Sequence, residues 1–300
     1  MENYLSQYQD YLLKEKKFSL HTVNAYIKDV QDFLVFTEND VVSVHEIVYL
    51  HIRQWLVHLS SQGLGNNSIN RKVASLKNYF RFLFITKTIA VYPLEGHKSL
   101  RTEKVLQVPF SEQEMQKIDR SHFKNDFFGL QEFVIISLFY SLGIRKSELI
   151  DLKVSDVDLK RRELKVLGKR SKERIVPLIS ETADVLSLYL AERNERIGTD
   201  LCPNLFVLKN NKKLNQTFVY RLINNYFRRV TSKEKKSPHM LRHTFATHML
   251  NAGADLNTIK EVLGHASLSS TQIYTHTSLA ALKKTYAQAH PRFLDDEDLL

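Results

Sequence analysis

The stretch FFGLQEFVIISLFYSLGIRKSEL, residues 127–149, decides how the second half of this 300-residue chain folds. Residues 127–142 are almost entirely apolar, and a helix that is apolar on every side must be buried in a core. Gly143 is placed to end this helix, as glycine commonly does. A second helical run begins shortly afterwards, so Arg145 is expected at a corner between two helices, held there by buried neighbours.

Alternating apolar and polar residues follow this corner and indicate two β-strands. The alternating stretches are residues 163–167 and 174–178, and the polar segment GKRSKE, residues 168–173, joins them. This pattern predicts an antiparallel hairpin with Lys169 at its turn. A lysine in a turn most often serves solubility, so the position alone assigns it no function.

A third motif is SPHMLRHTFATHML, residues 237–250, which has the spacing of a helix. His239 and Arg242 are three residues apart and share one face of that helix. His243 lies four residues after His239, a spacing that also suits zinc. However, Met240 stands where the metalloprotease motif H-E-x-x-H requires glutamate, so a zinc site is disfavoured.

The last motif lies near the C-terminal end of the chain. Asp255 is a cap candidate for a short helix over residues 256–263, which delivers His265 just beyond its end. Residues 269–272 then resemble a capping box, which places Tyr274 on a final short turn.

The motifs together supply two arginines, two histidines, a lysine and a tyrosine, without a cluster of acidic residues. The natural target of such a set is a phosphodiester, because guanidinium groups hold phosphoryl oxygens and offset the charge of the transition state. Metal ions do this work in many nucleases, so neither a metal nor another cofactor is expected here. A tyrosine, with an ordinary pKa of about 10, needs such cationic surroundings to act as a nucleophile.

The overall charge also favours an acidic partner such as nucleic acid. Lys and Arg number 43 and Asp and Glu 33, a formal net charge of +10. A membrane span is disfavoured because the longest nearly apolar stretch, residues 133–142, is about half of the roughly 20 residues required. The first residues resemble no signal peptide, and the single cysteine, Cys202, excludes an intrachain disulfide and a cysteine-rich zinc module. A soluble cytoplasmic protein is expected.

Helical spacing repeats in four segments up to about residue 94 and predicts a small bundle of four helices. Ser19 is the predicted cap of the second helix, and Ser68 that of the fourth, after a break at residues 63–67. The predicted apolar faces comprise Leu5, Tyr8, Leu12, Val23, Tyr26, Ile27, Val30, Phe33, Leu34, Ile52, Trp55, Leu56, Leu59, Ile69, Val73, Leu76, Phe80 and Leu83.

The fourth helix also carries polar and basic side chains away from its apolar face. They could reach DNA phosphates while the core stays dry, although a solvated helix face explains the same pattern. These candidate DNA-binding residues are Asn70, Arg71, Lys72, Lys77 and Arg81.

The domain organisation follows from where this spacing stops. Residues 95–109 are basic and aperiodic, which predicts a linker between a domain of residues 1–94 and a second domain of residues 110–300. A capping box formed by Ser111 and Glu114 opens the second domain.

At these motifs the sequence closely resembles the tyrosine recombinase (phage integrase) family, especially its bacterial Xer branch. The resemblance covers nearly the whole chain. The four catalytic motifs of the family occur in order as GIRKSEL (143–149), LGKRSKERIVPL (167–178), HMLRHTFATHML (239–250) and LGHASLSSTQIYTH (263–276). The segments TVNAY (22–26) and SINRK (68–72) look like parts of the DNA clamp of the family.

The resemblance implies a mainly α fold. It consists of a four-helix, SAM-like core-binding domain and an α-rich catalytic domain with a small antiparallel β-sheet. The resemblance also implies six catalytic roles: Arg145 and Arg242 bind the scissile phosphate, His265 hydrogen-bonds the same group, Lys169 protonates the leaving 5′ oxygen, His239 assists proton transfer from the nucleophile, and Tyr274 forms a 3′-phosphotyrosyl bond.

The implied function is site-specific recombination of double-stranded DNA. The covalent intermediate conserves the phosphodiester energy, so rejoining needs no ATP. The family resemblance implies four protomers on paired sites, either identical or combined with a related recombinase, and an accessory activator such as a DNA translocase. Chromosome dimer resolution or DNA inversion is the expected task, with integration of a mobile element as the alternative.

Other activities use some of the same features. A DNA-binding architectural protein would not need Tyr274, Lys169 and both arginines together. A topoisomerase of type IB shares the chemistry, but the N-terminal clamp argues against it as the main role, and a metal-dependent nuclease would need an acidic cluster. The tail, with acids and apolar ends in residues 293–300, is expected to dock on a neighbouring protomer, with packing on its own core as the alternative.

Overall fold

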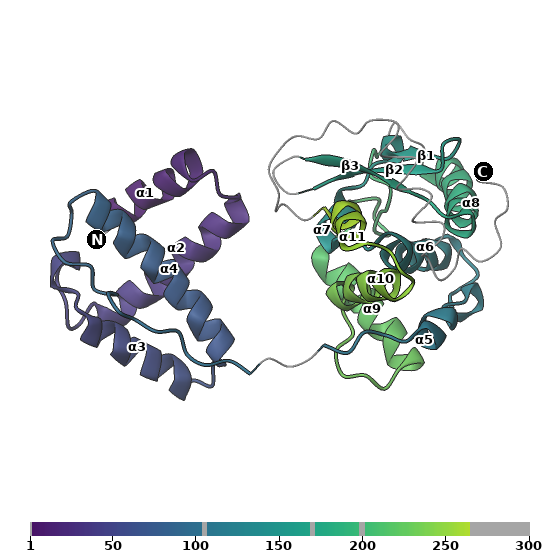
Figure 1. Ribbon diagram of the computed structural model, residues 1–300. Coiled ribbons are helices and arrows are strands. Elements are labelled where there is room, and N and C mark those ends of the chain that lie inside the picture. The colour runs from purple at the N-terminus through teal and green to yellow at the C-terminus, as the bar shows by residue number, and fades with distance from the viewer. Residues whose placement is uncertain (1, 104–106, 169–171, 198–201, 265–300) are drawn as a thin grey trace. The chain divides into compact units, whose positions relative to one another are not determined.

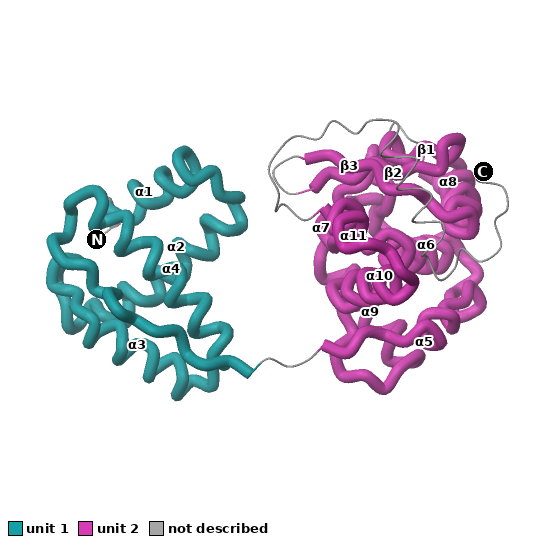
Figure 2. Tube along the Cα trace, in the orientation of Figure 1, with its two compact units in different colours: residues 1–105 teal, residues 106–300 magenta. Residues whose placement is uncertain are grey.

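The computed structural model describes four ranges of the chain, residues 2–103, 107–168, 172–197 and 202–264 (Figure 1). The chain divides into two compact units, Met1–Val105 and Leu106–Leu300 (Figure 2). Within the described ranges, no helix is long and apolar enough to cross a membrane.

The first unit is the predicted bundle of four helical segments. Its helices are α1 (Glu2–Asp10), which continues into a π-helical turn (Tyr11–Glu15), α2 (Leu20–Thr37), α3 (Tyr49–Ser61) and α4 (Asn66–Ile85), with a 3-10 turn at Val44–Glu46. The Ser19 cap is confirmed, because its side chain accepts a hydrogen bond from the Thr22 backbone N–H at 3.3 Å.

The predicted cap of the fourth helix was wrong. Gly65, not Ser68, is the N-cap of α4. The Gly65 carbonyl already accepts hydrogen bonds from the backbone N–H groups of Ser68 and Ile69, at 2.9 and 3.1 Å, so Ser68 lies inside the first turn. A glycine in the extended conformation serves as an N-cap without a capping side chain.

Aromatic rings fill the core of the first unit. The Phe33 ring contacts Trp55 and Phe80 edge to face, with ring centroids 5.3 and 6.0 Å apart. All three side chains are buried. Edge-to-face contacts add to the stabilisation that comes from burying these large side chains, so α2, α3 and α4 are tied together at one point.

The second unit is rich in helices and contains one small sheet. Its helices are α5 (Glu112–Gln116), α6 (Phe127–Leu142), α7 (Lys146–Asp151), α8 (Ser180–Ile197), α9 (Gln216–Val230), α10 (Pro238–Asn251) and α11 (Leu256–Leu263), with 3-10 turns at Arg120–His122 and Val154–Asp156. The strands β1 (Val157–Asp158), β2 (Glu163–Leu167) and β3 (Glu173–Pro177) form an antiparallel sheet in the order β1-β2-β3.

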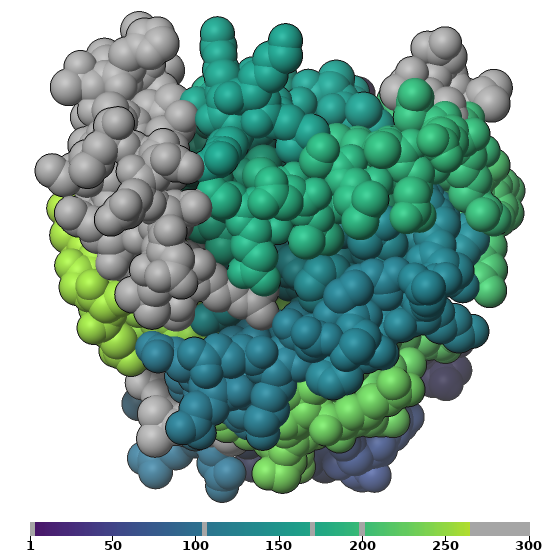
Figure 3. Space-filling view, turned by 90° about the vertical axis from the view of Figure 1, so that its right-hand side faces the viewer, coloured from purple at the N-terminus to yellow at the C-terminus, as the bar shows by residue number. Residues whose placement is uncertain are grey.

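Helix α6 is the centre of this unit, as its apolar sequence predicts. Nearly all of its side chains are buried, and it packs against α8 and α10. The Asp126 side chain caps its start by accepting from the Gly129 N–H at 2.7 Å, and Gly143 ends it in the left-handed conformation at φ 57°. Helix α8 lies at the right of Figure 1, and Figure 3 shows the surface on that side.

The predicted hairpin is confirmed, and three elements were not predicted. Strand β1 is only two residues long, too short for alternation to reveal it. Helices α8 and α9 also received no prediction, although apolar residues recur at helical spacing in α9. These buried residues are Val219, Leu222, Ile223, Tyr226 and Phe227.

The segment predicted as a linker is bound by side chains at both ends. In the first unit, Asn70 exchanges two hydrogen bonds of 2.9 Å with the backbone of Leu100. In the second unit, the Lys233 ammonium donates to the Pro109 carbonyl at 2.6 Å. Each end of the segment is therefore part of the unit beside it.

Candidate active site

Arg145 stands where the corner between α6 and α7 was predicted. Two residues after Gly143 the backbone is extended, at φ −76° and ψ 151°, and Arg145 becomes the N-cap of α7. Its backbone N–H donates to the Glu148 carboxylate at 2.8 Å. This bond satisfies an N–H group at the start of the helix and fixes the Arg145 backbone on a buried element.

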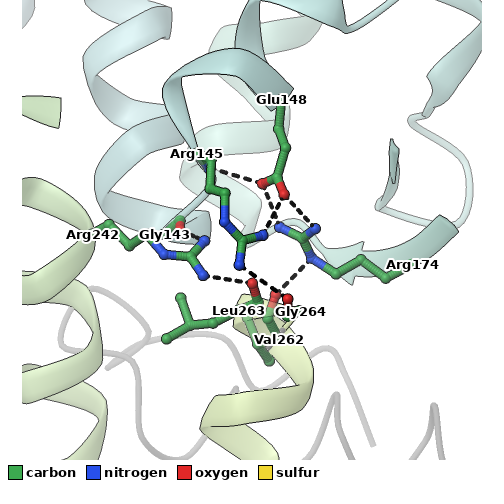
Figure 4. Close-up of polar contacts among 8 residues, drawn as sticks. All are labelled: Gly143, Arg145, Glu148, Arg174, Arg242, Val262, Leu263 and Gly264. Carbon is green, nitrogen blue, oxygen red and sulfur yellow. Dashed lines mark hydrogen bonds and ion pairs between the residues drawn. The ribbon is translucent and has the colours of Figure 1, made fainter. Parts of the chain in front are cut away.

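Three arginine side chains converge on the C-terminal end of α11 (Figure 4). They come from β3, α10 and the start of α7, and each donates to one of three consecutive carbonyl groups. These hydrogen bonds are Arg174 Nε to Val262 O at 2.8 Å, Arg242 Nη2 to Leu263 O at 2.6 Å, and Arg145 Nη2 to Gly264 O at 3.0 Å. They satisfy carbonyls that have no partner inside the helix.

The Glu148 carboxylate joins two of these arginines. One of its oxygens accepts from Arg145 at 2.6 Å and from Arg174 at 3.0 Å, and the other accepts from Arg174 at 2.8 Å. Burial alone would raise the pKa of Glu148, but the hydrogen bonds and charge of Arg174, together with the hydrogen bonds of Arg145, outweigh it and hold the pKa at about 2. Glu148 is therefore ionised at neutral pH.

The cluster of Arg145, Arg174, Arg242 and Glu148, here called the arginine cluster, carries an excess of positive charge. Burial and then the charge of Arg145 lower the pKa of Arg242 to about 10, against the opposing effect of Glu148. Arg242 still keeps its proton at neutral pH. The Arg145 side chain is 33% exposed, so an anion in solvent can reach the cluster there.

The structure places three of the six predicted catalytic residues. It brings Arg145 and Arg242 together at the end of α11. His239 lies in the first turn of α10 with an exposed side chain. The predictions for Lys169, His265 and Tyr274 lie outside the described residues.

Glu148 and Arg174 were missed as members of the site. For Arg174 the sequence did contain a signal. In β3 the inward-facing positions are Arg174 and Val176, so a charged residue occupies a position where alternation predicts an apolar one. A buried arginine of this kind needs hydrogen-bond partners, and the structure supplies the Glu148 carboxylate and the Val262 carbonyl.

Four of the five candidate DNA-binding residues have partners within their own unit. Asn70 binds Leu100, as described above, and the Lys77 ammonium donates to the His97 carbonyl at 3.2 Å. Arg71 forms a two-pronged contact with Asp29, and Lys72 contacts the carboxylates of Asp29 at 3.1 Å and Asp32 at 2.7 Å.

Two residues of this set keep a substantial exposed surface. The Arg71 side chain is 52% exposed despite its ion pair. Arg81 is exposed and lines a cavity of about 780 Å³ beside Tyr92. The described ranges contain no group of His, Cys, Asp and Glu side chains that could hold a metal ion.

His248, in the motif of residues 239–250 that also contains His239 and Arg242, has a structural role. His248 is buried in α10, and its two ring nitrogens contact the Tyr140 hydroxyl at 3.1 Å and the Phe110 carbonyl at 2.9 Å. Burial lowers the pKa of His248, so its ring is neutral at physiological pH. It ties α10 to α6 and to the start of the second unit.

Comparison with family models identifies both halves of the chain. Residues 111–280 match the phage integrase family, and residues 5–87 match the N-terminal SAM-like domain of phage integrases. The chain is 34% identical over 299 residues to tyrosine recombinase XerC from Thermodesulfovibrio yellowstonii, covering 98% of each protein. It is 36% identical to the XerC of Staphylococcus carnosus, covering 94% of this chain and 95% of that protein.

Solved structures of recombinases have the same fold. XerH recombinase bound to its palindromic difH substrate after cleavage has a TM-score of 0.70 and 23% identity, covering 94% of this chain and 84% of XerH. XerH in its pre-cleavage complex with difH is 25% identical, with a TM-score of 0.65, covering 93% and 83%. The integrase of transposon Tn1549, in complex with circular intermediate DNA, has a TM-score of 0.65 at 19% identity, covering 92% and 98%.

These similarities confirm the resemblance and the mainly α fold class predicted from the sequence. They extend over nearly the full length of both this chain and its curated relatives. The chain therefore belongs to the phage integrase family and is a site-specific tyrosine recombinase that acts on DNA.

Proposed function

We propose that the arginine cluster binds the scissile phosphodiester of a recombination site and that Tyr274 attacks it. The observation that supports this proposal is the charge of the cluster. Three guanidinium groups meet at the end of α11, two of them share the Glu148 carboxylate, and the charge of Arg145 also acts on Arg242. A phosphodiester that reaches the exposed side of Arg145 supplies a negative charge, and its transition state supplies a second.

The remaining catalytic roles follow the same chemistry. The Tyr274 oxygen bonds to phosphorus, the bond to the 5′ oxygen breaks, and Lys169 gives a proton to that leaving oxygen. His239 assists removal of the Tyr274 proton, and His265 hydrogen-bonds the phosphate. Attack by a 5′ hydroxyl of another strand then reverses these steps and reseals the DNA.

We further propose that the biological task is chromosome dimer resolution or DNA inversion in the cytoplasm. The XerC relative from Thermodesulfovibrio yellowstonii covers 98% of the chain, and a relative at 25% identity, XerH, binds its difH substrate as a site-specific recombinase. Four protomers on paired sites, alone or with a related recombinase, carry out the exchange, and a DNA translocase activates it. The tail after residue 290 docks on the neighbouring protomer.

The first test concerns the nucleophile. Tyr274→Phe removes only the phenol oxygen, so it should bind a recombination site as tightly as the wild type and form no covalent adduct. The measurement is a denaturing gel after incubation with a nicked suicide substrate, in which the cleaved strand cannot be rejoined. A covalent adduct at the wild-type level would assign the attack to another residue.

The second test concerns the general acid. Lys169→Ala should cleave ordinary DNA at least about 100-fold more slowly, because the 5′ oxygen then leaves without a proton. A substrate with sulfur in place of that bridging oxygen should restore cleavage, since a thiolate leaves unprotonated. Tyr274→Phe is the control and should stay inactive on both substrates. A defect of equal size on the sulfur substrate would remove Lys169 from the acid role.

A further inference from the structure

Arg174 is a charged residue that lies entirely inside the second unit. It belongs to β3 and is 5% exposed. Its guanidinium uses both Nη atoms on the two oxygens of Glu148, at 3.0 and 2.8 Å, and its Nε on the Val262 carbonyl at 2.8 Å. One side chain therefore binds a residue of α7 and the last turn of α11 at the same time (Figure 4).

Both of these partners also hold Arg145. The Glu148 oxygen that accepts from Arg174 at 3.0 Å also accepts from Arg145 at 2.6 Å. Arg145 makes its other contact with the Gly264 carbonyl, two residues after Val262. A Cβ atom built on Gly264 would lie 3.0 Å from Arg174 Nη1, so the Arg174 side chain packs directly against this turn. Removing Arg174 would take away one of the contacts that hold each of the two groups to which Arg145 binds.

Arg174 also changes how much charge Arg145 can offer to an anion. Without Arg174, Glu148 and Arg145 would form a pair with no net charge. With Arg174 in place, two guanidinium groups share one carboxylate, so Arg145, Arg174 and Glu148 together carry one positive charge in excess. Buried charges in such surroundings act more strongly than they do in water.

We propose that Arg174 is a positioning residue for DNA cleavage. It is too deeply buried to touch the DNA, and it acts by holding Arg145 through Glu148 and through the last turn of α11. This inference rests on the proposed function, in which Arg145 binds the scissile phosphate. The alternative is that Arg174 only stabilises the fold, and an experiment must distinguish this from a positioning role.

Arg193 provides a matched control for that alternative. It is a buried arginine of the same unit, 1% exposed, and its guanidinium also binds carbonyl groups. The carbonyls belong to Leu205 at 3.1 Å, Cys202 at 2.6 Å and Asn204 at 2.7 Å. Loss of Arg193 should therefore lower stability without disturbing Arg145.

The experiment measures single-turnover cleavage of two substrates below the melting temperature of every variant. One substrate is ordinary DNA, and the other carries an uncharged methylphosphonate at the scissile position. On ordinary DNA, Arg174→Ala should cleave about 100-fold more slowly than the wild type with unchanged DNA affinity, because a small misplacement of a catalytic group has this effect. On the methylphosphonate the deficit should shrink, as it should for Arg145→Ala, since less charge must be neutralised.

Arg193→Ala should lower the melting temperature and cleave both substrates at the wild-type rate. Arg174→Lys keeps the positive charge beside Glu148, but an ammonium group cannot reproduce the planar set of hydrogen bonds to both Glu148 oxygens and the Val262 carbonyl. Its cleavage rate should therefore fall between those of the wild type and Arg174→Ala. If Arg174→Ala does not fold, Arg174→Lys provides the same comparison, with a smaller deficit that also shrinks on the methylphosphonate.

Two outcomes would overturn the inference. One is wild-type cleavage by the Arg174 variants, and the other is an equal deficit on both substrates. A deficit of Arg145→Ala that persists on the methylphosphonate would instead contradict the proposed function. If the deficit shrinks on the methylphosphonate for Arg145→Ala but not for the Arg174 variants, only the role of Arg174 is rejected.

Discussion

Each unit contains a buried carboxylate that several basic side chains share. In the second unit it is Glu148, and in the first it is Asp29, which accepts hydrogen bonds from Arg71, from Lys72 at 3.1 Å and from Ser75 at 2.8 Å. Asp29 lies on α2 and its donors lie on α4. Arg71 and Lys72, two of the residues predicted from the sequence to meet DNA, thus also stabilise the fold of their own unit.

Replacing Asp29 by asparagine should destabilise the first unit by about 2 kcal/mol at neutral pH, because the charged hydrogen bonds that Arg71 and Lys72 donate to this buried carboxylate are lost. Burial alone would raise the pKa of Asp29, but its three donors together lower it below the ordinary value of 3.8. The carboxylate therefore contributes its full stability above the unfolded pKa, and this contribution disappears as the pH falls through the lower folded pKa.

Urea unfolding of both proteins at a series of pH values checks this prediction. The stability difference between the wild type and Asp29→Asn should be constant near neutral pH and shrink below about pH 4. Asp32→Asn is the matched control on the same helix. The Asp32 side chain is 41% exposed, and within the described residues its one ion-pair partner is Lys72. A difference as large for Asp32 as for Asp29, or one that does not change with pH, would contradict the account.

At the scale of elements, the end of α6 is where α10 and α11 meet the catalytic corner. The Gly143 carbonyl accepts from Arg242 at 2.8 Å, and its backbone has φ 57°. A Cβ atom at this position would lie 2.4 Å from the Phe245 ring of α10 and 2.9 Å from Leu263 of α11. Glycine is therefore required both by the backbone conformation and by the close approach of two helices.

Gly143→Ala should destabilise the second unit by about 3 kcal/mol, the sum of left-handed strain and overpacking. It should also slow DNA cleavage, because Arg242 and Arg145 are both anchored next to this residue. Chemical denaturation and single-turnover cleavage measure the two effects.

Gly253→Ala is the matched control for that substitution. Gly253 has φ 89° and nothing lies within 4 Å of a Cβ atom built there, so only strain of about 1 to 2 kcal/mol applies. Equal losses in both variants would show that the packing of α10 and α11 against Gly143 contributes little.

At the scale of the whole molecule, the formal net charge of +10 predicts strongly salt-dependent DNA binding. Each neutralised phosphate should contribute about −0.9 to the slope of log affinity against log salt concentration. Arg81→Ala should reduce the magnitude of this slope by about one, since Arg81 is exposed on α4 and is predicted to contact a phosphate.

Binding titrations at several salt concentrations provide the measurement. Lys14→Ala is the control, because Lys14 is 73% exposed in the same unit but is paired with Asp10 and not predicted to touch DNA. An unchanged slope for Arg81→Ala would exclude Arg81 from the DNA contact. A nearly flat slope for the wild type would contradict phosphate binding by the protein as a whole.

Local sequence patterns were enough to predict several helices and their ends. The bounds of α6, the Ser19 cap and the capping box of Ser111 and Glu114 agree with the structure. Apolar spacing and caps depend on residues a few positions apart, so they can be recognised without knowledge of the fold. The order of the four motifs also sufficed to recognise the family.

Which charged residues are buried, and which residues they pair with, depends on how distant elements pack together. Arg174 meets Val262 across 88 positions of sequence, and Arg71 meets Asp29 across 42. A charged side chain enters a core only when another element brings it a partner, because an unpaired buried charge costs several kcal/mol. No local pattern specifies that partner, so the packing of α4 on α2, and of β3 and α7 on α11, determines the roles of these residues.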